Sequence, residues 1–200
     1  MNIAVTGSLG TGKSTVSKIL AAALETELLD TDQLCRRQML PGTEGFEDFR
    51  RTFGKKFNQS DNTIDRQALR LAVFQDEQLR TQLERILHPL VQREVSSYCK
   101  ECRRRGKILV VEVPLLYEVG WQDEFDASVV VYVPEKICIE RVRARNGLAV
   151  EEIKQIMRSQ MSIDKKRHYA DFIIDNSGTF VSTVQQIAWL SKKLSRKSKV

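Results

Sequence analysis

Residues 7–15, GSLGTGKST, combine three glycines, a lysine and several hydroxyls in a spacing that suits a polyphosphate. Gly7, Gly12, Lys13 and Ser14 occupy the fixed positions of the pattern G-x-x-x-x-G-K-[ST]. Glycines let backbone N–H groups turn toward an anion, and the helix that follows directs its positive dipole end to the same place. Lys13 is expected to reach the β- and γ-phosphates, and Ser14 to help hold Mg²⁺. The predicted nucleotide contacts are Gly10, Thr11, Gly12, Lys13, Ser14 and Thr15.

Two carboxylates, Asp30 and Asp32, follow the apolar run TELL. Transfer of a phosphoryl group to a hydroxyl requires a carboxylate that accepts the hydroxyl proton. Asp32 suits that role, and Asp30 suits a place near Mg²⁺ or its waters. Alternatively, both residues cap the helix that follows, because Asp-Thr-Asp is also a good capping sequence. The two roles are compatible.

His88 and a group of arginines are further candidates. His88 directly precedes Pro89, where one helix is expected to end and the next to begin, and a lone histidine there is more often structural than catalytic. Arg141 and Arg145 are four residues apart, so they share a helix face and are able to clamp a polyphosphate together. Arg143 is equally well explained as part of a solvated surface.

Alternating strands and helices are expected to position these residues. The predicted strands are 2–6, 26–30, 107–113, 128–133 and 172–175, and helices are predicted at 13–25 and 134–147. Continuous β-branched runs are typical of parallel strands buried on both faces. The order predicts an α/β fold with a five-stranded, mostly parallel sheet and helices on both faces. Ligands bind at the carboxyl ends of such strands, where the candidate residues are therefore expected to gather.

Two additions to this fold are predicted within a single domain, 1–200. Residues from about 31 to 106 show helical pattern without a convincing strand, and Asp65 is expected to cap one of the helices. This insertion is longer than a crossover helix, so we expect a substrate-binding lobe. A charged helix over 150–168 is expected to belong to a lid, at about 140–168, that closes over the nucleotide.

Composition favours one globular domain, since 42% hydrophobic residues in a chain of 200 suffice for one sizeable core. No apolar run approaches the ~20 residues of a membrane span. The chain opens on a core strand, so we expect no signal peptide and a cytoplasmic location. Cys99 and Cys102 form a single CxxC without a second pair, and Cys35 and Cys138 stand alone. Ordinary helix cysteines are expected here, rather than a zinc site, a redox pair or a disulfide framework.

The net charge of +6 is concentrated in two places. Five of the residues 191–200 are Lys or Arg, and the segment 100–107 is also basic. Such stretches are more often solvated helix ends than nucleic-acid or lipid contacts, and neither contains the aromatic residues of a single-strand binder. Excess positive charge suits a substrate rich in phosphates. We expect no nucleic-acid or membrane partner, and a monomer or small homo-oligomer.

A series of short motifs extends this pattern from the first strand to about residue 188. They are GSLGTGKST, DTD, LPG (40–42), FG (53–54), IDRQALR (64–70), HPL (88–90), VPLLYE (113–118), RVRAR (141–145), Q…KKR..AD (160–171) and DNSG (175–178). In this order they closely resemble the dephospho-CoA kinase family. The resemblance implies a P-loop, nucleoside-kinase-like fold and ATP-dependent phosphorylation of the ribose 3′-hydroxyl of dephospho-CoA. The implied products are coenzyme A and ADP, and the implied cofactor is ATP with Mg²⁺.

The resemblance also implies roles for individual residues. Asp32 is the implied base, with Lys13 and Arg141 completing the catalytic set. The residues implied to line the acceptor site are Arg66, His88, Pro114, Leu115 and Leu116. Arg141 and Arg145 are implied to act on the ATP phosphates, and Asn176 to lie near the adenine.

Three positions depart from the family pattern. Ser8 replaces a usual glycine of the phosphate loop. Ile156 stands where many members carry arginine, so contacts of the lid are expected to be rearranged there, with Arg158 or Lys166 compensating. Glu112 stands where many members have aspartate, which puts a role of that side chain in Mg²⁺ binding in doubt.

Three other functions compete with this prediction. Another nucleoside or nucleotide kinase of the same fold has no evident use for the insertion that carries IDR and HPL. A non-catalytic GTP switch requires N-K-x-D, which the sequence lacks. A nucleic-acid binder acting through residues 191–200 requires affinity with a steep salt dependence.

Overall fold

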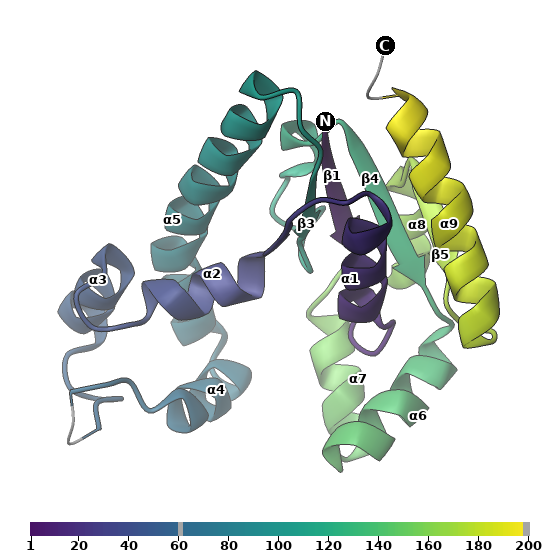
Figure 1. The fold of residues 1–200 in the computed structure, drawn as a ribbon. Coiled ribbons are helices and arrows are strands. Elements are labelled where there is room, and N and C mark those ends of the chain that lie inside the picture. The colour runs from purple at the N-terminus through teal and green to yellow at the C-terminus, as the bar shows by residue number, and fades with distance from the viewer. Residues whose placement is uncertain (60–61, 198–200) are drawn as a thin grey trace. The chain divides into compact units, whose positions relative to one another are not determined.

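A computed structural model describes residues 1–59 and 62–197 (Figure 1). The chain divides into two units, each with its own core. One contains Met1–Asp30 together with the chain from Cys99 onward, and the other is Thr31–Tyr98. The basic stretch 191–200 is described as far as residue 197, and its last three residues lie outside the described part of the chain.

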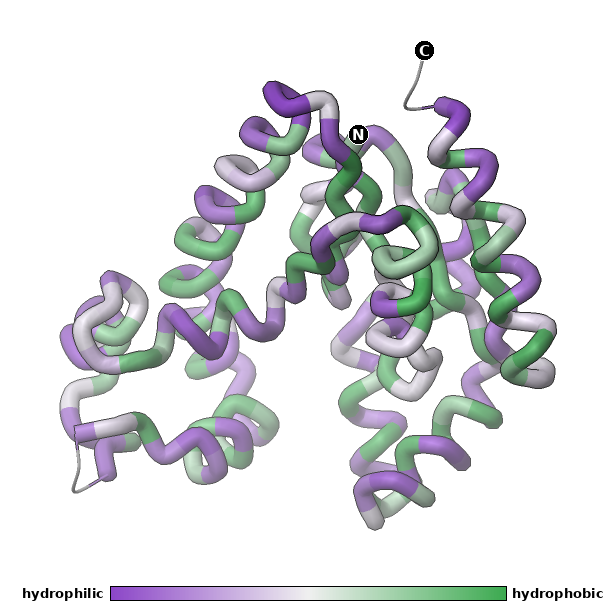
Figure 2. Tube along the Cα trace, in the orientation of Figure 1, coloured by the Kyte–Doolittle hydropathy of each residue, from purple (hydrophilic) through white to green (hydrophobic). Residues whose placement is uncertain are grey.

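Within the described residues, the first unit is built on a five-stranded parallel sheet with the strand order β2-β3-β1-β4-β5. The strands are β1 (Asn2–Thr6), β2 (Leu28–Asp30), β3 (Leu109–Glu112), β4 (Ala127–Tyr132) and β5 (Phe172–Asp175). Ala4 of β1 pairs with Val111 of β3 on one side and with Ser128 of β4 on the other. The apolar runs of β1 and β4 stand out in Figure 2. The predicted α/β fold is confirmed, and the sheet is parallel throughout its described strands.

Helices cover the sheet because alternate strand residues point to opposite faces. On one face, α1 (Lys13–Ala23) and α9 (Phe180–Lys197) pack side by side. The shared core contains Ile3, Val5, Val129, Val131, Val16, Leu20, Ile187 and Leu190. On the other face, Asn2 donates from Nδ2 to the carbonyl of Cys99, near the end of the long helix α5 (Glu77–Arg104). The remaining elements of this unit are α6 (Glu135–Asn146), α7 (Val150–Arg158), α8 (Ile163–Tyr169) and the short 3₁₀ helix η1 (Gln122–Glu124).

The second unit is helical. It consists of α2 (Thr31–Gln38), α3 (Glu44–Phe53), α4 (Arg66–Gln75) and most of α5. Its core includes Met39, Phe46, Phe49, Phe57, Ile64, Leu69, Leu79 and Leu87. Asp65 caps α4 as predicted, since its carboxylate accepts hydrogen bonds from the backbone N–H groups of Gln67 and Ala68, at 3.0 and 2.9 Å.

Two helix predictions are wrong. The single helix predicted over 150–168 is divided into α7 and α8, because Ser162 caps a new helix by accepting a hydrogen bond from the backbone N–H of Lys165. The helix boundary predicted at His88 and Pro89 is absent, and α5 runs through both residues. A proline inside a helix costs about 3 kcal/mol. Burial of Leu87, Leu90 and Val91 around it offsets that cost.

In the described part of the chain, no helix combines the length and apolar character needed to cross a membrane.

The cysteines offer a test of the packing. Cys99 and Cys138 are buried, and burial raises the pKa of each thiol to about 11. Only about one such thiol in a thousand is ionised at pH 8. We expect iodoacetamide to alkylate the partly exposed Cys102 and Cys35 first, with Cys99 and Cys138 reacting only after unfolding. Peptide mapping by mass spectrometry checks this, and equal rates at Cys99 and Cys102 in the native protein would contradict it.

Candidate active site

The loop between β1 and α1 has no room for side chains at its three glycines, and two of them also have strongly left-handed backbone angles. Gly10 has a φ of +84°, and a Cβ there would lie 2.8 Å from the carbonyl oxygen of Cys138 in α6. Gly12 also has a φ of +84°, and a Cβ would lie 2.5 Å from Nδ2 of Asn176. Both positions therefore require glycine for the backbone angle and for the space. The loop is fixed by its neighbours as well as by its own residues.

Hydrogen bonds within the phosphate loop further stabilise its conformation. The Thr11 hydroxyl donates to the carbonyl of Ser8 at 2.9 Å, and Nζ of Lys13 lies 3.4 Å from the same oxygen. Thr11 is fully buried. Ser14 and Thr15 are exposed in the first turn of α1, and the positive end of this helix faces the loop.

Ser14 lies against Glu112. Its hydroxyl donates to Oε1 of Glu112 at 2.8 Å, and Glu112 is buried at the end of β3. In the sheet register Glu112 pairs with Asp30, the last residue of β2. The departure of Glu112 from the family pattern left its role in Mg²⁺ binding in doubt, although an acidic residue that ends a fully apolar strand is a detectable signal.

The oxygen atoms of Ser14 and Glu112 suit Mg²⁺, which needs few protein ligands, better than a metal ion bound entirely by protein side chains. The part of the chain that the structure describes contains no group of three or more His, Cys, Asp and Glu side chains able to hold a metal ion. Mg²⁺ is typically bound through one or two protein oxygens, with waters and substrate phosphates completing the set. The Ser14 hydroxyl and the Glu112 carboxylate fit that donor set.

Asn176 and Arg141 lie beside the loop. Asn176 donates from Nδ2 to the carbonyl of Thr11 at 2.8 Å, and its Oδ1 accepts from the Thr183 hydroxyl at 2.8 Å. Arg141 donates to the backbone carbonyl of Asn176 at 2.9 Å. The Asn176 side chain thus ties the chain after β5 to the phosphate loop, and Arg141 is held next to both.

Arg145 behaves differently from Arg141. It is exposed near the end of α6, where its Nε donates to the side chain of Asn146 at 2.7 Å. Arg143 is also exposed. The structure therefore brings Arg141, but not Arg145, to the loop.

The segment after β3 presents two residues and buries a third. Pro114 and Leu115 are partly exposed, whereas the Leu116 side chain is fully buried. Lys166, expected from the sequence to compensate in the lid, is also fully buried and forms an ion pair with Glu118. Because its side chain is fully buried, Lys166 does not present its charge at the surface of the lid.

The remaining predicted residues belong to the helical unit. Asp32 is exposed in the first turn of α2, which starts directly after β2. Arg66 donates to the carbonyl of Arg36 at 3.3 Å, joining the start of α4 to α2. Burial lowers the pKa of His88 below its usual 6.5, and the Glu84 carboxylate partly opposes this shift. Burial therefore favours the neutral form of the His88 imidazole.

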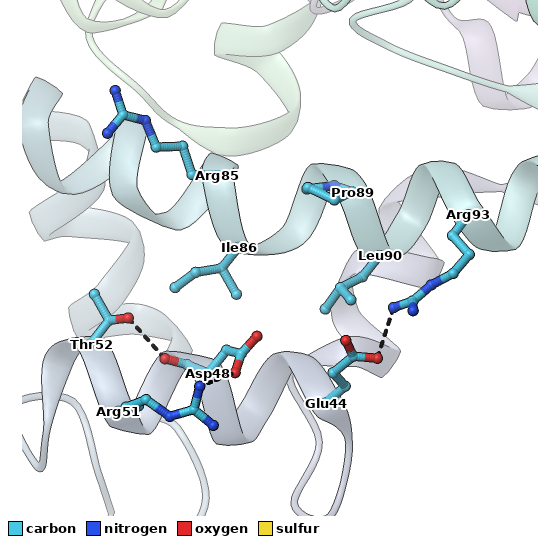
Figure 3. A pocket seen from close by; sticks show the side chains of 9 residues that line it. All are labelled: Glu44, Asp48, Arg51, Thr52, Arg85, Ile86, Pro89, Leu90 and Arg93. Carbon is cyan, nitrogen blue, oxygen red and sulfur yellow. Dashed lines mark hydrogen bonds and ion pairs between the residues drawn. The ribbon is translucent and has the colours of Figure 1, made fainter.

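A groove of about 600 Å³ lies between α3 and α5 in the same unit. Figure 3 shows Ile86 and Leu90 of α5 directed toward α3. Two ion pairs lie along the groove, Arg93 with Glu44 at 2.7 Å and Arg51 with Asp48 at 3.1 Å. Its lining contains none of the predicted site residues. His88 lies on α5 between the lining residues Ile86 and Pro89 but does not line the groove.

Comparison with known proteins decides between the kinases that share this fold. The family model described as dephospho-CoA kinase matches residues 1–182. A dephospho-CoA kinase of Symbiobacterium thermophilum is 41% identical over 94% of this chain and 79% of its own length. A dephospho-CoA kinase of Enterococcus faecalis is 34% identical over 98% of both chains.

The chain belongs to the dephospho-CoA kinase family.

Solved structures agree with this. A dephospho-CoA kinase from Campylobacter jejuni has a TM-score of 0.73 and 26% identity, and the match covers 98% of both chains. A protein from Thermus thermophilus has a TM-score of 0.79 and 30% identity, covering 98% of this chain and 97% of the other. A shikimate kinase from Acinetobacter baumannii, at 20% identity and a TM-score of 0.53, shares the fold alone.

For this member of the dephospho-CoA kinase family, Gly10 offers a sharp test because the phosphate-loop pattern leaves that position open. We expect Gly10→Ala to weaken ATP binding at least about tenfold, since strain at positive φ and the contact with Cys138 force the loop to move. Isothermal titration calorimetry measures the affinity. The control is Gly106→Ala, with a φ of +62° but open space around its Cβ. Equal ATP affinity in both variants would contradict the packing argument.

Proposed function

We propose that the protein transfers the γ-phosphoryl group of ATP to the ribose 3′-hydroxyl of dephospho-CoA, giving coenzyme A and ADP in the cytoplasm. The match of residues 1–182 to the dephospho-CoA kinase family carries this proposal. The phosphate loop, with Arg141 and Glu112 beside it, supports it at the level of chemistry. In this proposal, residues from about 31 to 106 form the substrate-binding lobe and residues from about 140 to 168 form the lid.

In phosphoryl transfer the protein mainly positions the two substrates and neutralises the negative charge of the phosphates. Lys13 and the backbone N–H groups of the loop bind the β- and γ-phosphates. Arg141 adds positive charge beside the loop, and Arg145 joins it from the lid. Asn176 holds the loop and contributes to the adenine side of the nucleotide site. Mg²⁺, when bound with ATP, neutralises phosphate charge, and Ser14 and Glu112 are the residues that would hold it.

The acceptor is oriented by the remaining residues. Asp32 accepts the proton of the 3′-hydroxyl as the hydroxyl attacks phosphorus. Arg66 supplies positive charge for the phosphate groups of dephospho-CoA, and neutral His88 supplies a hydrogen bond. Pro114 and Leu115 offer apolar contact, and the buried Leu116 supports them from beneath. Closure of the lid excludes water, which otherwise competes as the acceptor.

The proposed reaction is tested by ADP release from Mg-ATP with dephospho-CoA, adenosine or AMP as the acceptor. Dephospho-CoA alone is expected to stimulate release, and mass spectrometry should find a product heavier by one phosphoryl group. Stimulation by AMP or adenosine instead would replace the proposal by another kinase of this fold.

Asp32→Asn tests the base. We expect kcat to fall about 10²- to 10⁴-fold, the usual contribution of general base catalysis, while ATP affinity is kept. Steady-state kinetics and calorimetry separate the two effects. Asp123→Asn, at an exposed position of η1 outside the proposed lobe and lid, is the control and should behave as wild type. Full turnover by Asp32→Asn would refute the assignment of the base.

Glu112→Gln tests the proposed Mg²⁺ site. We expect the Mg²⁺ concentration for half-maximal turnover to rise at least about tenfold, in line with other disturbed metal surroundings. Calorimetry of ATP binding with and without Mg²⁺ should show the same loss of Mg²⁺ dependence. Glu27→Gln is the control, because Glu27 is exposed just before β2, at the amino ends of the strands and away from the phosphate loop. An unaltered Mg²⁺ requirement in Glu112→Gln would exclude Glu112 from the site.

A further inference from the structure

Lys166 is a charged side chain with no exposed surface. Its Nζ lies 2.9 Å from Oε1 of Glu118 and donates to the carbonyl of Pro114 at 2.8 Å. Burial lowers the pKa of Lys166, and the hydrogen bond and charge of Glu118 oppose that shift. An ammonium group buried this completely is tolerated only with good partners, and here they come from the segment that follows β3.

Glu118 makes a second connection. The Oε1 atom that faces Lys166 also accepts a hydrogen bond from the backbone N–H of Met161 at 2.8 Å. Met161 lies between α7 and α8, three residues after the C-terminal end of α7. We call this end, which belongs to the proposed lid, the base of α7. One carboxylate therefore joins the end of the segment 114–118 to the base of α7 and to α8.

The Pro114 carbonyl makes the third connection. It accepts from Lys166 and also from the hydroxyl of Thr6, at 3.2 Å. Thr6 ends β1 directly before the phosphate loop, and Pro114 follows Glu112 by two residues. The ammonium group of Lys166 is thus two hydrogen bonds away from the residue that introduces the phosphate loop.

Stability alone does not account for this arrangement. A buried ion pair commonly contributes no more than apolar side chains of similar volume would, because desolvation cancels the attraction. A satisfied buried network does, however, hold its members in one geometry. Lys166 holds the backbone of Pro114, which is a proposed acceptor residue and lies two residues after Glu112. Glu118 holds the backbone of Met161 at the base of α7.

We infer that Lys166 and Glu118 are positioning residues for phosphoryl transfer, which fix the segment 114–118 relative to the base of α7. This inference rests on the proposed function of that segment and of the lid. Neither side chain contacts the reacting atoms. They act through the backbone of Pro114 and of Met161, and their effect falls on the acceptor more than on ATP.

The double variant Lys166→Met/Glu118→Leu separates positioning from stability. Either single change to an apolar residue leaves a buried charge unpaired and is expected to destabilise the fold, whereas the double change removes both charges. We expect the double variant to unfold in urea near the wild-type midpoint and to bind ATP normally. Its kcat/KM for dephospho-CoA should fall about a hundredfold, as expected for a displacement of about 1 Å near the reacting groups.

Two further measurements complete the test. Hydrogen exchange at the Met161 amide should accelerate in the double variant, because that N–H loses its acceptor. Glu118→Gln keeps an acceptor oxygen at the same place, so it provides a second, milder variant with an intermediate loss of kcat/KM. Lys192→Met, at an exposed position of α9 outside the proposed lid and lobe, is the control and should retain wild-type kinetics.

The outcomes distinguish the inference from the function on which it rests. A folded double variant with wild-type kcat/KM, or activity in Glu118→Gln that falls only with the folded fraction, would overturn the positioning role alone. Wild-type protein that does not phosphorylate dephospho-CoA would overturn the proposed function and this inference with it.

Discussion

All described strands of the sheet run in the same direction, so their carboxyl ends meet at one edge, and the candidate nucleotide site depends on this constraint. The phosphate loop leaves β1 there, Glu112 ends β3, Asp30 ends β2 and Asn176 follows β5. These residues are far apart in the chain but come from neighbouring or nearly neighbouring strands. The parallel arrangement of the strands alone therefore brings these distant segments together at the place where the phosphates are expected to bind.

The phosphate loop is held in shape mostly from outside. Gly10 rests against the backbone of α6, and Gly12 against the side chain of Asn176. Because Asn176 is in turn held by Thr183 of α9, the loop is linked to helices that follow β4 and β5. Such support keeps the backbone N–H groups oriented toward a phosphate without reorganisation, which is how an electrostatic site is most effective.

Buried polar groups are concentrated close to this edge. Thr6, Thr11, Glu112 and Lys166 are all buried and hydrogen-bonded. The bonds of Thr6, Glu112 and Lys166 link strand ends, or the segment that follows β3, to a loop or helix, and that of Thr11 lies within the phosphate loop. Burying them is costly unless they are paired, so they restrict the backbone to few arrangements. In the helical unit, by contrast, the core is dominated by Phe46, Phe49, Phe57 and leucines, and ion pairs such as Arg51 with Asp48 and Arg93 with Glu44 lie at the surface.

Local chemistry determined much of this protein from the sequence alone. The β-branched runs specified the strands, the glycine spacing specified the phosphate loop, and Asp65 specified a helix start, because each acts through its immediate neighbours. Packing decided the rest. Helix α5 continues through Pro89 because leucines around it are buried, and Arg141 rather than Arg145 reaches the loop because it meets Asn176. The contacts of Ser14 with Glu112 and of Lys166 with Glu118 join residues distant in the chain, and only the tertiary fold brings these polar groups together.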